Sequence, residues 1–363
     1  MRRIAVIDAD LIGRKKHSFP NLACMKISGW HKEQGNDVVL KMDYKHLEEF
    51  DTVYISKVFT DTPCPEKVLE LENVIYGGTG FFFDRAYPLP YLMEHHMPDY
   101  HLYDEYVEAQ LAKGRDMKSY TDYSIGYLTR GCFRGCQFCV NRNYSEVQEH
   151  SPLTEFLDES RPKICLLDDN FLGCPHWKGH LEELIATGKK FVFKQGMDER
   201  LLTDEKCRML FGAKYDGDYI FAFDDVSDYE LIEKKLKLIR KHTSTRDIRF
   251  YVLCGFDREG RYDTAFWIDD IRSIFVRIDL LSKYQVKPYL MRYEKVYKSE
   301  FSGIYTVLAN WINFPPAFAK QSLNEFVTAS LKSRKSYMRY LTDFNKKYPH
   351  HDRGWFNWKY ERR

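Results

Sequence analysis

The chain has 363 residues, enough for one large domain or for two to three smaller ones. Aromatic residues make up 16% of it, which argues against a disordered chain, and a formal net charge of +2 gives no overall sign of a nucleic-acid partner. No run of 18 uninterrupted apolar residues occurs, so the sequence predicts no membrane span. Nine cysteines, mostly scattered, are not typical of a disulfide framework and favour a reducing, cytoplasmic location.

Residues 1–90 alternate strand and helix signals. Helical spacing over Ala23–Gln34 ends at Gly35, a residue typical of helix ends. Short β-rich runs, each expected to form a strand, are Ile4–Ile7, Val38–Leu40, Val53–Ile55 and Val74–Tyr76. The alternation predicts a small open α/β, Rossmann-like domain over residues 1–90. Residues 91–123, with Pro98, many tyrosines and mixed charges, are expected to form a linker wrapped over the surface.

Residues 124–295 hold six strand-like runs separated by helical ones. One apolar stripe recurs at spacings of four and three, as on one face of a helix, at Trp267, Ile271, Ile274, Ile278 and Leu281. The strand–helix alternation predicts a parallel sheet, here a partial (β/α)6 barrel whose ligands lie at the carboxyl ends of the strands. The six runs are Ser124–Leu128, Ile164–Asp168, Lys190–Lys194, Tyr219–Phe223, Ile248–Leu253 and Val286–Met291.

The tail, residues 296–363, is expected to be a helical extension and is basic. From residue 320 onward it has eleven Lys and Arg against four Asp and Glu. Basic residues interleaved with aromatic ones suit RNA backbones and unstacked bases. The alternative, which we favour, is an amphipathic helix that packs on the barrel with a solvated basic face and is followed by an aromatic cap. The residues concerned are Lys332, Arg334, Lys335, Arg339, Lys346 and Lys347 with Tyr337, Tyr340, Phe344, Trp355 and Trp358.

The most specific motif is C-x3-C-x2-C directly after the first strand-like run of the barrel region, made by Cys132, Cys136 and Cys139. Soft thiolates suit iron–sulfur clusters, and three of them can hold a [4Fe–4S] cube while its fourth iron stays open. Gly131 and Gly135 let the backbone wrap closely around such a cube. A structural zinc site is the alternative, but it wants a fourth ligand nearby, and the next histidine, His150, is eleven residues on.

This motif in the loop after the first strand of a six-unit α/β barrel resembles the radical S-adenosylmethionine superfamily. The surrounding Tyr127-Leu128-Thr129-Arg130-Gly131-Cys132 looks like the branch with an N-terminal cobalamin-binding-type domain. The resemblance implies that the open iron binds S-adenosylmethionine and that one electron from an external flavodoxin- or ferredoxin-type donor breaks a C–S bond, making a 5′-deoxyadenosyl radical. The substrate is open, RNA or a peptide included, as is the choice between methyl transfer, sulfur insertion and rearrangement.

The same resemblance implies contacts to S-adenosylmethionine at the first strand ends. Asp168-Asp169-Asn170 closes the second strand, where the family usually places a polar or acidic group against the amino group of the cofactor. An ordinary turn is the alternative, since Asp and Asn favour turns. Phe138, just before the last motif cysteine, looks like the family's aromatic residue near adenine, with simple packing as its alternative.

Later strand ends supply further candidates. Arg200, after the third strand, and Arg292, at the end of the sixth, are candidates to pair with the cofactor carboxylate. Asp224 ends the fourth strand, and Gly255, after the fifth, has room to admit adenine. Each of these four has an ordinary surface or ion-pair role as its alternative.

Cobalamin domains typically carry D-x-H-x-x-G, with the histidine as the lower cobalt ligand. The comparable string here is Asp8-Ala9-Asp10-Leu11-Ile12-Gly13, in which Asp10 takes the histidine position. Gly77-Gly78-Thr79-Gly80 looks like the family's loop along the corrin tail. We expect a retained scaffold without cobalamin, although binding through the corrin alone stays possible.

A second functional hypothesis is a non-catalytic iron–sulfur or zinc protein that binds nucleic acid through its tail. Such a protein would not require polar residues at strand ends beyond the cysteines.

Overall fold

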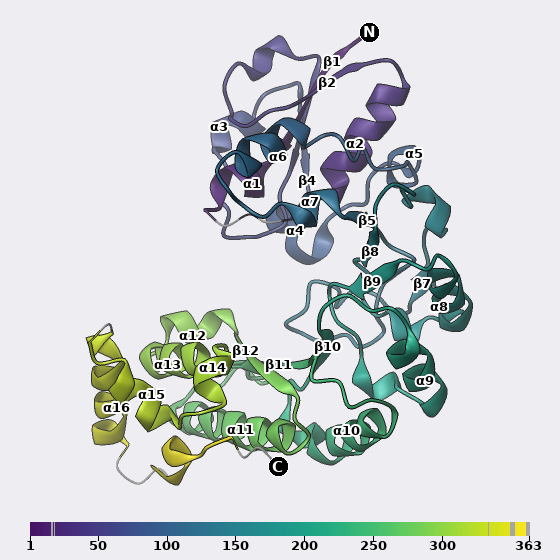
Figure 1. The fold of residues 1–363 in the computed structure, drawn as a ribbon. Helices are drawn as coiled ribbons and strands as arrows, with labels where there is room; N and C mark the ends of the chain where they lie inside the picture. The colour runs from purple at the N-terminus through teal and green to yellow at the C-terminus, as the bar shows by residue number, and fades with distance from the viewer. Residues whose placement is uncertain (16, 18, 333, 349–352, 361–363) are drawn as a thin grey trace. The chain divides into compact units, whose positions relative to one another are not determined.

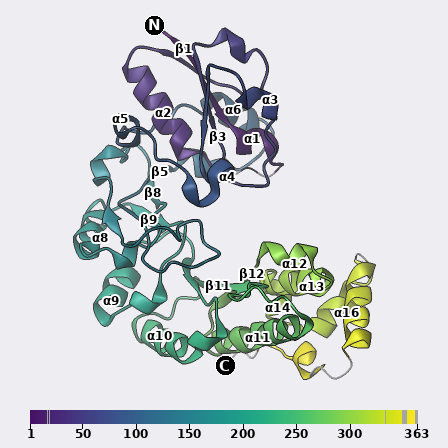
Figure 2. The same cartoon turned by 180° about the vertical axis from the view of Figure 1, so that it is seen from behind.

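The computed structural model describes residues 1–15, 17, 19–332, 334–348 and 353–360, and the chain divides into two compact units, Met1–Lys194 and Gln195–Arg363 (Figures 1 and 2). Both units combine parallel strands with helices, as the α/β prediction expects. Within this described part, none of the helices combines the length and the apolar character that crossing a membrane requires.

The first unit opens with a four-stranded parallel sheet in the order β2-β1-β3-β4. Its strands are β1 (Arg3–Asp8), β2 (Asp37–Leu40), β3 (Thr52–Ser56) and β4 (Val74–Gly77). Helix α2 (Leu22–Glu33) packs along β1, β2 and β3, and Ile4 pairs with Val38 on one side and Thr52 on the other (Figure 1). The four predicted strands and the predicted helix are confirmed. Shorter helices connect the strands, namely α1 (Ala9–Gly13), α3 (Glu66–Leu69) and α4 (Thr79–Phe82), with 3₁₀ turns at Leu47–Glu49 and Phe83–Arg85.

The segment expected as a surface linker belongs instead to the core of this sheet. It forms three helices, α5 (Tyr91–Glu94), α6 (Asp104–Leu111) and α7 (Lys118–Thr121). Its buried side chains pack with Ile4 and Val6 of β1 in one apolar cluster, and they are Met93, Tyr100, Leu102, Tyr103, Val107, Met117 and Tyr120. Tyrosine-rich sequence looks like surface because of its hydroxyl groups, but here the rings are buried and the hydroxyls of Tyr100 and Tyr103 are hydrogen-bonded.

A second parallel sheet completes the first unit in the order β5-β8-β9. Its strands are β5 (Tyr123–Gly126), β8 (Lys163–Leu166) and β9 (Lys190–Phe193), and Ile164 pairs with Ser124 and Phe191. Helix α8 (Trp177–Ala186) connects β8 to β9. Two short antiparallel strands, β6 (Thr129–Arg130) and β7 (Gln148–Glu149), close the base of a long loop after β5, and 3₁₀ turns occupy Leu153–Glu155 and Phe171–Gly173.

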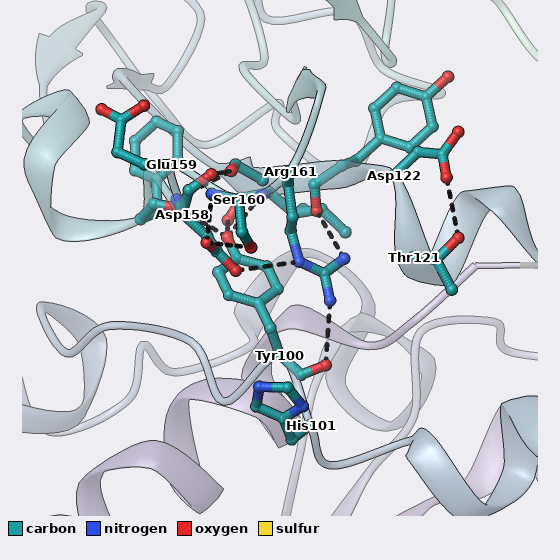
Figure 3. Close-up of polar contacts among 12 residues, drawn as sticks. Tyr100, His101, Thr121, Asp122, Asp158, Glu159, Ser160 and Arg161 are labelled. Carbon is teal, nitrogen blue, oxygen red and sulfur yellow. Dashed lines mark hydrogen bonds and ion pairs between the residues drawn. The ribbon is translucent and has the colours of Figure 1, made fainter.

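Arg161 ties the start of this sheet to the preceding segment (Figure 3). Its guanidinium donates to the carbonyl oxygens of Tyr120 at 2.6 Å, Tyr123 at 3.2 Å and Tyr100 at 3.1 Å. It also lies 4.3 Å from the centroid of the Tyr100 ring, with Asp158 Oδ2 3.4 Å from its Nε. Five donors in a rigid fork suit a site where several carbonyls converge. This joint holds the amino-terminal edge of β5 and β8, opposite the strand ends where ligands are expected.

The second unit is built on a three-stranded parallel sheet in the order β10-β11-β12. Its strands are β10 (Tyr219–Ala222), β11 (Ile248–Cys254) and β12 (Lys287–Arg292). Its helices are α9 (Asp204–Gly212), α10 (Tyr229–His242), α11 (Thr264–Lys283), α12 (Glu294–Lys298), α13 (Ser302–Ile312), α14 (Pro315–Phe318), α15 (Leu323–Ala329) and α16 (Lys335–Lys347), with 3₁₀ turns at Glu199–Leu201, Val226–Asp228 and Arg353–Asn357. All six predicted strands are present. These six strands form two three-stranded sheets, one per unit, so a single partial barrel stays a prediction.

The tail packs on its own unit. Tyr337, Leu341 and Phe344 form the buried face of α16. Trp355 stacks on Phe275 of α11 with 6.0 Å between ring centroids, and Trp358 Nε1 donates to Asp279 Oδ1 at 3.0 Å. The favoured interpretation, an amphipathic helix followed by an aromatic cap, is therefore confirmed for the described residues. Residues 333, 349–352 and 361–363 of the tail lie outside them.

Candidate cofactor site

The three motif cysteines lie on the loop between β6 and β7. The strand pairing of Thr129 with Glu149 closes the base of this loop. All three thiols are half-buried, whereas the other cysteines apart from Cys64 are buried. The amide of Cys139 donates to the carbonyl of Cys136 at 2.9 Å, which makes a tight turn between these two ligand positions. Partly exposed thiols on a tight loop can reach a metal group that buried thiols cannot.

Two glycines shape this loop for different reasons. Gly131 has φ of +95°, and a Cβ there would lie 2.4 Å from the carbonyl oxygen of Glu146. Gly135 has φ of +60° with open space around it, so only its backbone conformation calls for glycine. The predicted need for glycine beside the cysteines is met at both positions.

Asp168 holds the chain that leads into the cysteine loop. Its carboxylate is buried at 1% exposure and accepts from the Thr129 amide and hydroxyl, both at 2.7 Å, and from the Leu128 amide at 3.3 Å. Burial raises the pKa of Asp168 to about 7, although the bonds from Thr129 and Leu128 oppose the shift. Because these donors belong to the protein, the described contacts of Asp168 are structural.

Asp169 contacts both ends of the segment that carries the cysteines. Its Oδ2 accepts from the Gly131 amide at 2.8 Å, and its Oδ1 accepts from Asn141 Nδ2 at 2.8 Å. Arg130 Nε lies 3.5 Å from Oδ2, and the Arg130 guanidinium sits 4.1 Å from the centroid of the Tyr127 ring. Asp169 therefore joins the residue before the first cysteine to the second residue after the last.

Asn170 points its amide at the first cysteine. Its Nδ2 donates to Cys132 Sγ at 3.4 Å, and the backbone amide of Asn141 donates to Cys139 Sγ at 3.4 Å. The Asn170 Oδ1 atom is buried and has no hydrogen-bond partner among the described residues. Buried polar atoms are nearly always paired, so an unpaired acceptor beside the cysteine loop is unusual.

This donor set fits an iron–sulfur cluster. Three thiols with N–H groups directed at two of the sulfurs are what cluster ligation and tuning require. Across the residues that the structure describes, no three His, Cys, Asp or Glu side chains gather tightly enough to hold a single metal ion. Phe138 is half-buried beside Cys139, and its role near adenine stays a prediction.

The 3₁₀ turn Phe83–Arg85, which follows α4, also contacts the cysteine loop. Asp84, in the turn after α4, accepts from Arg142 Nε at 2.6 Å, and its carbonyl accepts from Asn143 Nδ2 at 3.0 Å. Arg142 Nη1 in turn donates to the carbonyl of Gln137, inside the motif, at 3.0 Å. The guanidinium beside Asp84 holds the pKa of that carboxyl below its usual range.

In the second unit, Arg200 is paired within its own turn. Its Nε lies 2.7 Å from Asp198 Oδ1, and the side chain is about one third exposed. The neighbouring Glu199 is buried and accepts from the Ala222 amide of β10 at 3.2 Å. Burial, with the nearby charge of Asp198, raises the pKa of Glu199 to about 8. Arg200 thus lies at the carboxyl end of β10, where its guanidinium is already paired with the Asp198 carboxylate.

A buried arginine that the sequence did not single out organises the next strand ends. Arg277 of α11 is 1% exposed and donates through Nη1 to the carbonyls of Phe223 at 3.0 Å, Asp224 at 2.9 Å and Leu253 at 2.7 Å. Burial raises the pKa of the Asp224 carboxyl to about 6, with the Arg277 charge opposing the shift. Asp270, on the same helix, accepts from the Gly255 amide at 2.9 Å. In the sequence, the only indication that Arg277 is buried is its place next to Ile278 in the apolar stripe of α11.

Gly255 and Arg292 have local contacts that differ from their predicted roles. Gly255 has φ of +74°, and a Cβ there would lie 2.1 Å from Val296, so close packing also requires glycine. Arg292 Nη1 donates to Thr306 Oγ1 at 3.0 Å, and its guanidinium lies 4.9 Å from the centroid of the Tyr297 ring. The structure therefore brings the cysteine loop and residues 168–170 together in the first unit. The predicted residues of the second unit share the carboxyl edge of its own sheet.

At the carboxyl edge of the N-terminal sheet, where doubly wound sheets bind ligands, the acidic side chains are bonded to protein groups. Asp10 is buried, and its carboxylate accepts from the Val58 amide at 2.6 Å, the Phe59 amide at 3.4 Å and the Thr62 hydroxyl. A Cβ at Gly78 would lie 2.4 Å from the Lys57 carbonyl oxygen, so the glycine loop is packed against the segment after β3.

A second buried network lies beside Asp10. The Tyr103 hydroxyl donates to Asp8 Oδ2 at 2.9 Å. His17 places Nδ1 2.7 Å from the Tyr120 hydroxyl and Nε2 3.6 Å from Asp8 Oδ2. Both ring nitrogens of His17 therefore face protein groups rather than a groove. The residues at this edge do not fit a corrin with a histidine ligand.

This chain is similar to solved structures but to no protein-family model or curated protein. No protein-family model matches the chain, and no curated protein matches it. Among the solved structures that are similar to this chain are three of a cobalamin-dependent S-adenosylmethionine radical enzyme, OxsB. The form with aqua-cobalamin and S-adenosylmethionine bound has a TM-score of 0.43 and 11% identity, covering 96% of this chain and 62% of that chain.

The other two structures of that enzyme are less similar. The apo form has a TM-score of 0.38 and 13% identity, and the aqua-cobalamin form has 0.34 and 12%. Each covers 80% of this chain and 49% of that chain, so this chain spans less than two thirds of that enzyme's length.

Proposed function

We propose that the chain is a radical S-adenosylmethionine enzyme that holds a [4Fe–4S] cluster through Cys132, Cys136 and Cys139. The observation that carries this proposal is the cysteine loop itself, with N–H donors on two of its sulfurs and an unpaired buried acceptor beside the first. When bound, the cluster and S-adenosylmethionine supply the one-electron cleavage of a C–S bond that yields a 5′-deoxyadenosyl radical, with the electron coming from an external flavodoxin- or ferredoxin-type donor.

The chain's own residues position and shield this chemistry. Asn170 directs its amide at Cys132 and leaves Oδ1 to accept from the amino group of S-adenosylmethionine. Asp168 fixes the chain before the loop, and its protein contacts support a positioning role. Phe138 is proposed to lie against adenine. Further cofactor contacts are proposed for the strand-end residues of the second unit, Arg200, Asp224, Gly255 and Arg292.

A non-catalytic protein that binds nucleic acid through its tail has less support. Tyr337 and Phe344 are buried in the unit, and Trp355 stacks on Phe275, so these rings are not available to stack on bases. The basic residues of α16 form a solvated face, which an ordinary amphipathic helix also has.

The enzyme proposal is tested by cofactor cleavage. With dithionite and S-adenosylmethionine under anaerobic conditions, the reconstituted protein should release 5′-deoxyadenosine and methionine, slowly when substrate is absent. Cys136→Ala should abolish this release, while Cys64→Ala, also a half-buried thiol, should leave it intact. If cluster-loaded protein releases no 5′-deoxyadenosine, even with cell extract supplied as a source of substrate, the proposal is wrong.

A further inference from the structure

One carboxylate spans the segment that carries all three cysteines. Asp169 accepts from the Gly131 amide through Oδ2 and from Asn141 Nδ2 through Oδ1, each at 2.8 Å. Its side chain is 9% exposed, so these bonds form largely out of water. A carboxylate that accepts from two fixed donors and lies beside a guanidinium makes strong, charge-assisted bonds.

From this geometry we infer that Asp169 is a positioning residue for the cysteine loop and not a contact to S-adenosylmethionine. The inference rests on the proposed function for its meaning, because it assigns the ligand loop a built-in support. The neighbouring Asn170 differs, since its Oδ1 is unpaired among the described residues. The polar run after β8 therefore divides into loop supports, Asp168 and Asp169, and one residue open to a cofactor.

The physical reason is loop entropy. Residues 131–141 hold the three ligands, and fixing a flexible loop of this length costs conformational free energy when a cluster binds. A bridge between its two ends, already formed before the cluster arrives, removes part of that cost. The bridge should therefore slow both the exposure of the thiols in the apo protein and the loss of iron from the loaded protein.

The test uses the fact that Asp169 accepts both hydrogen bonds of the bridge, whereas Asn141 donates one of them. In Asp169→Asn, the amide cannot accept from both donors, so one bond is lost. In the double variant Asp169→Asn with Asn141→Asp, the new amide accepts from Gly131 through Oδ1 and donates through Nδ2 to the new carboxylate. The double variant (the swap) therefore restores both hydrogen bonds, with the carboxylate and the amide exchanged between positions 169 and 141. Asn141→Ala removes one arm of the bridge and leaves the Asn141 backbone amide that faces Cys139.

Two readouts separate this inference from the proposed function. Alkylation of Cys132, Cys136 and Cys139 by iodoacetamide in the apo protein, followed by mass spectrometry, needs no cluster. Release of iron to a chelator from reconstituted protein reports on the loaded site. Both rates should rise about tenfold in Asp169→Asn and in Asn141→Ala, the effect of losing one charge-assisted hydrogen bond, and should return toward wild type in the swap.

The matched control is Asp122→Asn, the same change at the opposite edge of the sheet, where Asp122 accepts from the hydroxyl of the neighbouring Thr121. Neither rate should change there. Wild-type alkylation and iron-release rates in Asp169→Asn, with weakened S-adenosylmethionine binding, would overturn the inference and leave the proposed function standing. If the wild-type protein takes up no iron, but alkylation is faster in Asp169→Asn and restored in the swap, the proposed function is wrong and the inference on Asp169 stands. Faster rates that the swap does not rescue would also contradict the bridge.

Discussion

At the scale of single residues, the polar run after β8 shows how a motif and its surroundings divide their roles. The sequence predicts the cysteines from their spacing and assigns Asp168, Asp169 and Asn170 together to the cofactor. Their contacts differ, because the Asp168 and Asp169 carboxylates accept from donors that lie 28 to 40 residues earlier in the chain, whereas Asn170 Oδ1 has no hydrogen-bond partner among the described residues. No local pattern encodes such pairings, so the strand-end position was predictable and the hydrogen-bond partners were not.

Asn170 gives a prediction at this scale. Asn170→Leu removes the N–H donor to Cys132 Sγ and the unpaired acceptor at similar side-chain size. Hydrogen bonds to sulfur favour the reduced, more negative cluster, so the midpoint potential of the reconstituted protein should become more negative. A potentiometric titration followed by electron paramagnetic resonance measures it. Asn143→Leu, in the same loop but bonded to Asp84, should leave the potential unchanged. Equal potentials in all three proteins would contradict the assigned bond.

At the scale of elements, buried parallel strands are the part of this fold that sequence predicts best. The run Ile4–Ile7 becomes β1, whose side chains beyond Arg3 are buried, because a parallel strand covered on both faces is a continuous apolar run. Segment 91–123 was harder to predict because its helices are short and three of its seven core side chains are tyrosines. The buried Arg277 on α11 was missed for a related reason, since its partners are main-chain carbonyls of two other strands.

The carboxyl edge of the N-terminal sheet carries a prediction about elements. Asp10 is bonded to the segment after β3, and Tyr103 of the α5–α6 segment is bonded to Asp8 at the end of β1. Cobalt bonding by histidine needs an open imidazole nitrogen, and His17 offers none to a groove. The protein expressed with excess cobalamin should therefore show no corrin absorption after gel filtration. A stoichiometric corrin band would contradict this and make methyl transfer the leading chemistry.

At the scale of the whole molecule, both units contain carboxyl groups whose pKa burial raises toward neutral pH. The pKa is raised by burial to about 7 for Asp8 and Asp168, to about 8 for Glu199 and to about 6 for Asp224. Whether the two three-stranded sheets join as one barrel depends on contacts between residues far apart in the chain. The periodicity of apolar residues predicts each strand and helix, but it does not predict whether the two sheets close into a barrel.

These carboxyl groups predict how stability changes with pH. From about pH 6.5 to about pH 8 the unfolded chain has released protons that the folded chain still holds, so unfolding releases protons and stability falls as pH rises through this window. Desolvation lowers the pKa of the buried His31 and of the half-buried His17 and His150, so these groups change the stability mainly below that window, where stability rises with pH.

Glu199→Gln tests this dependence, because the amide oxygen can still accept from Ala222. It should reduce the loss of unfolding free energy between about pH 6.5 and about pH 8.5 by at most about 1.4 kcal/mol per pH unit, measured by chemical denaturation. Glu105→Gln, an exposed change on α6, should keep the wild-type slope. An unchanged slope in Glu199→Gln would show that burial does not hold this proton.

The measurement that tests the account most directly is the metal content of anaerobically purified protein, read with its absorption spectrum. The account predicts a brown protein with about four irons and matching sulfide per chain. It also predicts loss of both in Cys132→Ala, Cys136→Ala and Cys139→Ala, but not in Cys64→Ala. A colourless protein that carries stoichiometric zinc, or iron that survives loss of any motif cysteine, would contradict it.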